Sequence, residues 1–132
     1  MRSTRMLLMV LLVVSAVVLN GCASSEESAQ SEGIAAGTAQ YKMGTLKSVE
    51  PTSIDKVYDA TLKAMEELKL AVLQKNVDSM SGEIVARDVA DKKITITLNA
   101  TTDGMTKLSI KVGMLGDEAK SRLIYEQIKK KQ

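Results

Sequence analysis

The chain has 132 residues, enough for one small domain. It contains no histidine and one cysteine, which excludes Ser–His and Cys–His nucleophile pairs, an internal disulfide and the usual zinc ligand sets. Two of its 18 basic residues, Arg2 and Arg5, belong to an N-terminal targeting pattern, and the others balance the 16 acidic residues. Net charge therefore gives no reason to expect binding to nucleic acid.

Residues 1–21 have the pattern of a signal peptide. After the two arginines, Met6 to Leu19 is almost wholly apolar but too short to span a membrane as a helix. The run ends in Leu19-Asn20-Gly21-Cys22, which resembles the lipobox of bacterial lipoproteins. The resemblance implies cleavage between Gly21 and Cys22 and a diacylglycerol on the Cys22 thiol, so that the membrane is the first expected partner.

Residues 22–40 are expected to be the lipidated cysteine and a flexible tether. Ala23 to Gln40 is rich in Ser, Ala, Glu, Gly and Gln, with Ile34 as its only large apolar residue, so it buries too little apolar surface to fold. Its typical reach is about 23 Å, which keeps the following domain near the membrane. By the sorting rule of enteric bacteria, Ala23 after the cysteine implies residence in the outer membrane, facing the periplasm.

Residues 41–132 are expected to form a single α+β domain. Tyr41 to Val49 predicts a first strand, stopped by Glu50-Pro51, and Thr52 is expected to cap a helix. Apolar residues at spacings of three and four predict the buried stripe of this helix. The stripe consists of Ile54, Val57, Tyr58, Thr61, Met65 and Leu68.

Four further strands and a last helix are expected. The strands are Leu70 to Val77, Gly82 to Arg87, Lys92 to Asn99, and, after the turn Thr101–Gly104, a run containing Leu108, Ile110 and Val112. Apolar and polar residues alternate in the last two strands, which indicates an antiparallel sheet with one packed face and one wet face. Asp117 is expected to cap a helix that buries Ala119, Leu123, Ile124 and Ile128. The predicted order is β-α-β-β-β-β-α, a two-layer fold with both helices on one face of a five-stranded sheet.

Two segments carry a family resemblance. Residues 47–58, KSVEPTSIDKVY, and residues 111–121, KVGMLGDEAKS, resemble, together with the lipobox and the tether, a family of small bacterial lipoproteins with a domain of unknown function. The resemblance brings no catalytic motif. The order of elements is also similar to the TBP-like, helix-grip domains of the BamC lipoproteins, which implies a similar fold but does not set function.

Four short patterns resemble catalytic or ligand-binding sites but are better explained by structural roles. Ser53-Ile54-Asp55-Lys56 matches the S-x-x-K of penicillin-recognising enzymes, but the companion S-D-N and K-T-G motifs are missing from the sequence. The loop Gly113–Gly116 precedes a helix that binds an anion only poorly, because Asp117 and Glu118 already place negative charge there. Asp55 and Asp59 have no third oxygen ligand nearby in the sequence. The methionines Met65, Met80, Met105 and Met114 are interpreted as core or turn residues.

The remaining candidate site is the solvent-exposed face of the predicted sheet. Its Thr- and Lys-rich strands offer a docking surface, by side-chain contact or by strand addition at its edge, although a solvated antiparallel strand carries the same residues. The face consists of Glu83, Arg87, Lys93, Thr95, Thr97, Lys107, Ser109 and Lys111.

We therefore expect a lipid-anchored, non-enzymatic interaction module of the cell envelope, with an envelope protein as its further partner, no metal and no cofactor. Two alternatives stay open. One is a carrier of a small ligand or lipid in a cavity between the helices and the sheet. The other is a hydrolase that works without histidine or cysteine.

Overall fold

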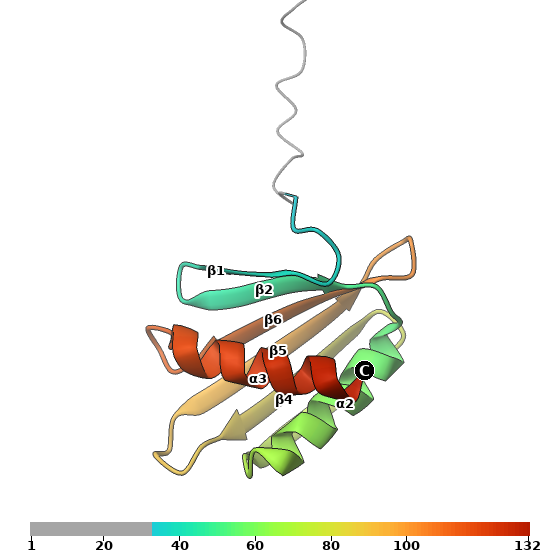
Figure 1. Ribbon diagram of the computed structural model, residues 1–132. Helices are drawn as coiled ribbons and strands as arrows, with labels where there is room; N and C mark the ends of the chain where they lie inside the picture. Colours follow the sequence, from blue (N-terminus) through green and yellow to red (C-terminus); the bar gives the residue numbers. More distant parts are fainter. Residues whose placement is uncertain (1–32) are drawn as a thin grey trace, which may run out of the picture. The chain divides into compact units, whose positions relative to one another are not determined.

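The strands of the protein pair into one antiparallel sheet, as a computed structural model of residues 33–132 shows (Figure 1). The elements are β1 (Ala39–Lys42), β2 (Thr45–Glu50), α2 (Ile54–Glu67), β3 (Ala71–Val77), β4 (Ser81–Arg87), β5 (Lys93–Ala100), β6 (Thr106–Val112) and α3 (Glu118–Lys131). The order of strands in the sheet is β1-β2-β6-β5-β4-β3. The predicted signal peptide, Gly21, Cys22 and the first part of the tether lie outside the described residues.

Both helices cover the same face of the sheet, with α2 over β3, β4 and β5, and α3 over β2 and β6 (Figure 1). The alternation predicted for β5 and β6 positions the core, because every second side chain of these strands points toward the helices. These inward residues, Ile94, Ile96, Leu98, Leu108, Ile110 and Val112, are at most 1% exposed. The α+β class and the two-layer arrangement are confirmed.

The first predicted strand is wrong in one respect: it is a hairpin of two strands, so the sheet has six strands instead of five. Met43 and Gly44 reverse the chain with φ angles of +52° and +79°. A two-residue turn with both φ angles positive joins antiparallel strands well, but its usual sequence is Asn-Gly or Asp-Gly. Methionine at the first position concealed the turn, and β1 begins at Ala39, inside the predicted tether.

The predicted cap of the first helix was also wrong. Ser53, in an extended conformation and without a side-chain cap bond, precedes Ile54 at the helix start. Thr52 belongs to the preceding loop, where its carbonyl oxygen accepts a hydrogen bond of 2.8 Å from Thr106 Oγ1 of β6. This hydrogen bond holds Thr52 against the sheet, one residue before the cap position. It joins residues far apart in the chain, so the local sequence does not predict it.

The last helix begins as predicted but buries a different stripe. Asp117 Oδ1 accepts a hydrogen bond of 3.0 Å from the Lys120 amide, which confirms the cap. Ala119 and Leu123 are exposed, contrary to the prediction, while the predicted Ile124 and Ile128 are buried. The helix turns Ser121 and Tyr125 inward as well, because these four residues share one face at spacings of three and four. Neither helix of residues 33–132 has the length and apolarity needed to cross a membrane.

The register of β5 can be tested in a fragment from Gly33 to Gln132, which contains the whole core described above. It starts before Tyr41 because the Gly37 amide bonds to the Val49 carbonyl at 2.7 Å. Ile96→Asp is expected to unfold the fragment, since it buries an unpaired charge and costs several kcal/mol, on the order of the whole stability. Thr95→Asp lies on the other face opposite Lys111 and is expected to change stability by less than about 0.5 kcal/mol. Urea denaturation measures both; similar losses would contradict the register.

Candidate functional site

The predicted interaction residues all lie on the face of the sheet that the helices leave uncovered. The register places their side chains next to one another across three strands: Arg87 opposite Lys93, Thr95 opposite Lys111, and Thr97 opposite Ser109. Lys107 lies opposite Asn99 on the same face. The threonines and Ser109 are half-buried and the lysines are exposed. The face is therefore a polar floor from which lysine side chains project.

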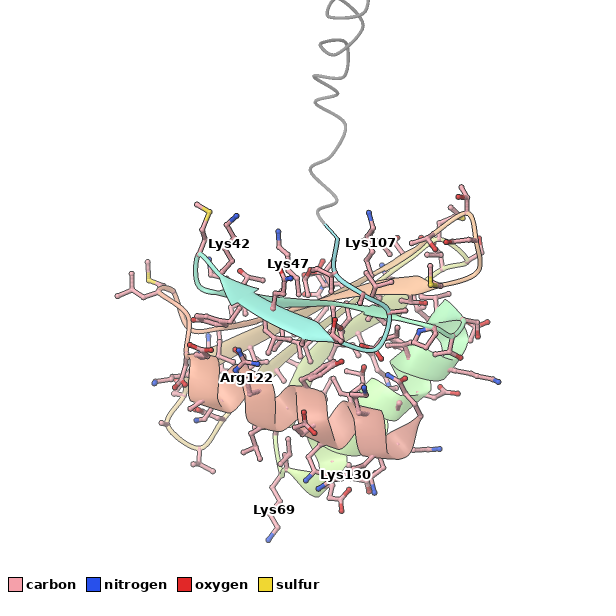
Figure 2. All side chains as sticks on the ribbon, turned by 45° about the horizontal axis from the view of Figure 1, so that its top comes forward. Lys42, Lys47, Lys69, Lys107, Arg122 and Lys130 are labelled. Atoms are coloured by element: carbon pink, nitrogen blue, oxygen red, sulfur yellow. The ribbon has the colours of Figure 1, made fainter. Side chains whose placement is uncertain are left out.

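The uncovered face also includes two lysines that the sequence analysis missed. Lys47 of β2 lies opposite Ser109, and Lys42 of β1 lies opposite Thr45. Both point away from the helices on the same side as Lys107, as Figure 2 shows. The alternation of side chains within Thr45–Glu50 is sufficient to place Lys47 on one face of its strand. Because the turn at Met43-Gly44 was not recognised, however, the sequence did not define how this strand pairs with its neighbours.

Charge on this face is one-sided. Lysine or arginine occupies six outward positions of the described strands, and Glu83 is the only acidic residue among them. The basic residues are Lys42, Lys47, Arg87, Lys93, Lys107 and Lys111. A chain with a net charge of only +2 therefore presents a strongly basic surface on one side, because folding sorts its charges between faces.

Ion pairs tie the loops at one end of the sheet to α3. Asp88 forms an ion pair with Lys120, and Asp117 lies 3.5 Å from Lys92. The hydrogen bond from Lys120 is the largest cause that lowers the pKa of Asp88, followed by the bond from the Lys92 amide. The pKa of Asp117 is lowered chiefly by the Lys120 amide that it caps. These carboxylates are structural, because they hold the β4–β5 loop against the helix.

A second polar group lies on the opposite, helix-covered face. Glu50 is fully buried and accepts a hydrogen bond of 2.7 Å from Ser48 Oγ. Burial raises the pKa of the Tyr125 hydroxyl, and the charge of Glu50 raises it further. Within residues 33–132, Glu50 Oε2 and Ser121 Oγ have no hydrogen-bond partner. Sequence reasoning took Glu50 only as the end of a strand; its enclosure between β2 and α3 keeps it from solutes.

A hollow of about 400 Å³ opens beside this group, between residues 37–39 and α3. Tyr125 Oη and Lys129 Nζ, which line it, both donate hydrogen bonds to the Gly37 carbonyl, at 3.3 and 2.7 Å. These bonds fix the point where the chain enters the domain. In the described part of the chain, no group of three or more acidic or cysteine side chains is arranged to hold a metal ion.

A family model described as "Protein of unknown function (DUF3568)" matches the chain over residues 5–131. The chain belongs to the DUF3568 family. The matched region includes the lipobox-like segment, both helices and all strands of the sheet. No curated protein matches the chain. Membership in DUF3568 assigns no activity to the face described above.

The role of Asp88 can be tested by its pH dependence. Because its pKa is lower in the folded state than the usual value near 3.9, it stabilises the fold above that pH, and this contribution is lost as the pH falls. Asp88→Asn is expected to lower the melting temperature at pH 7 and to have much less effect near pH 2. Thermal unfolding followed by circular dichroism at both pH values measures the difference. Asp103→Asn, at an exposed turn, is the control; an Asp88 effect that is independent of pH would contradict the ion-pair role.

Proposed function

We propose that this DUF3568 protein is a lipoprotein of the bacterial envelope, held to the outer membrane by lipid on Cys22. Its domain is a non-enzymatic module that binds an acidic surface of an envelope protein through the uncovered sheet face. The observation that carries the proposal is the basic character of this face. It combines projecting lysines with a floor of hydroxyl groups, and Glu83 is its only acidic strand residue in the described part.

Electrostatic complementarity supports an acidic partner. Lysines on a polar sheet raise the rate of encounter with a negative surface and select against basic partners. Three carboxylates outside this face have structural roles: Asp88 and Asp117 hold loops, and Glu50 is enclosed under α3. An interaction module therefore accounts for the geometry better than a hydrolase does.

The carrier alternative needs room between the helices and the sheet. The side chains there are packed, as the full burial of Leu46, Met65 and Ile84 illustrates. The hollow lies instead between residues 37–39 and α3, and polar and charged residues make up much of its lining. No observation on residues 33–132 favours a lipid or small-ligand cavity, so the interaction module is the function we propose.

The anchor is tested first. Thioether lipidation requires the thiol, so Cys22→Ser is expected to abolish incorporation of a clickable fatty acid and to leave the signal peptide uncleaved. In-gel fluorescence of labelled cells measures the label, and mass spectrometry of the purified chain measures cleavage. Ser24→Ala is the control and should retain full label. Equal labelling of wild type and Cys22→Ser would refute the anchor.

The sheet face is tested by charge reversal in the full-length protein. Lys93→Glu, Lys107→Glu and Lys111→Glu together are expected to abolish capture of envelope proteins that the wild type retains after detergent solubilisation. The loss should be greatest at low salt, where exposed charges are least screened. Each exposed substitution changes stability by less than about 0.5 kcal/mol, so the fold should survive.

A matched control carries the same change of charge on the helices: Lys56→Glu, Lys63→Glu and Lys130→Glu, all exposed. It is expected to capture the same proteins as the wild type. If the sheet variant captures them undiminished, or if both triple variants lose them equally, the sheet face is not the docking surface.

A further inference from the structure

One end of the sheet carries a cluster of unusually exposed apolar side chains. Met43, Met114 and Leu115 are 92%, 92% and 93% exposed, whereas Met80, at the other end of the sheet, is 61% exposed. Met43 belongs to the β1–β2 turn, and Met114 and Leu115 belong to the β6–α3 turn. Both turns lie at the left end of the sheet in Figure 1. Val89, 99% exposed, lies on the β4–β5 loop at the same end. We call Met43, Met114 and Leu115 the apolar tip.

The two turns of the apolar tip are in direct contact. A Cβ atom on Gly116 would overlap the carbonyl oxygen of Gly44, and one on Gly44 would come within 2.7 Å of the Leu115 carbonyl oxygen. Both glycines have positive φ angles, +79° and +87°, which other residues rarely adopt. The close approach of the two backbones brings the two turns together, so the three exposed apolar side chains are carried by adjoining turns.

Folding does not account for the residue types in this patch. Met43 has a φ angle of +52°, in the region where glycine, asparagine and aspartate are favoured. A polar residue there would both ease the turn and be better solvated. Large apolar side chains that are exposed on adjoining turns often mark a surface that binds a partner or a membrane.

The surroundings of the apolar tip are basic. Lys93, the first residue of β5, and Lys111, the penultimate residue of β6, lie at this end on the uncovered face. The acidic residues of the same end are paired: Asp88 with Lys120, Asp91 with Arg87, the cap residue Asp117 with Lys92, and Glu118 with Arg122. Lys93 and Lys111 form no ion pair within residues 33–132, so their charge is directed to solvent.

We infer that the apolar tip inserts into the interface of a phospholipid bilayer, while Lys93 and Lys111 contact anionic headgroups. Flexible, exposed methionine and leucine side chains on adjoining turns, with lysines at the same end of the sheet, fit a fluid anionic surface. The edge strand β1 runs from the point of chain entry to Met43, so a domain attached nearby can lay this edge along the membrane. The inference rests on the proposed function only in placing the domain at a membrane.

Tryptophan fluorescence tests the insertion, because the chain contains no tryptophan. Leu115→Trp is made in the full chain, purified from the membrane fraction and reconstituted in vesicles of phosphatidylethanolamine and phosphatidylglycerol. On the vesicles, its emission maximum is expected to lie at a shorter wavelength than that of the Gly33–Gln132 fragment with the same substitution, measured without lipid or detergent. Brominated lipids are expected to quench the emission of the vesicle sample. Met80→Trp, an exposed apolar position at the opposite end of the sheet, is the matched control and should show neither effect.

Adding Lys93→Glu and Lys111→Glu to Leu115→Trp is expected to remove most of the shift, since a lysine near an anionic surface contributes roughly fivefold to binding. The inference is overturned if Trp at position 115 shows no shift or quenching on vesicles, if the Met80→Trp control matches it, or if the shift appears without lipid as protein concentration rises, which would indicate self-association.

Mass spectrometry of the same samples separates this inference from the proposed anchor. If the chain carries no lipid on Cys22 but the emission of Trp at position 115 still shifts on vesicles, the proposed anchor is refuted and the insertion is supported. A lipidated chain without the shift retains the anchor and overturns the insertion.

Discussion

The structure depends on the packing of one face of β5 and β6 beneath two helices. Because side chains alternate along a strand, burying Ile96 and Ile110 forces Thr97 and Lys111 to the opposite face. A shift of one residue would bury lysines, which is prohibitively costly without partners. The polar face is thus a direct consequence of how the core is packed, and its residues are positioned on a rigid sheet.

This constraint also explains how a chain with a net charge of only +2 acquires a strongly basic surface. The acidic side chains of the described part are concentrated in loops and on helices, where several of them pair with Lys or Arg, as Asp88 does with Lys120. The strands contribute lysines outward and place Glu50 inward, where Ser48 and the capped helix α3 enclose it. Net charge alone would have hidden this separation, since it describes the whole chain and not one face.

The two proposed surfaces are distinct in chemistry and adjoin each other. The sheet face carries mainly threonine and lysine on strands, whereas the apolar tip consists of methionine and leucine on turns. Lys93 and Lys111 belong to the sheet face and lie at the end of the sheet that carries the apolar tip. A domain that touches the bilayer with its tip would present the rest of the face, including Lys47 and Lys107, to a protein at the membrane surface.

The sequence by itself determined the class of the fold, the polar face and the exclusion of histidine and cysteine chemistry. Alternation in β5 and β6 and the helical spacing of α2 are local periodicities, and each reports directly which side chains face the core. Only the tertiary structure decided that Tyr41 to Val49 contains a turn, that α3 buries Tyr125 instead of Leu123, and that Gly44 meets Gly116. These features arise from contacts between segments far apart in the chain: α3 rotates to pack on β2, and two backbones approach where neither carries a Cβ atom. No local pattern encodes such contacts, which is why the apolar tip was not visible in the sequence.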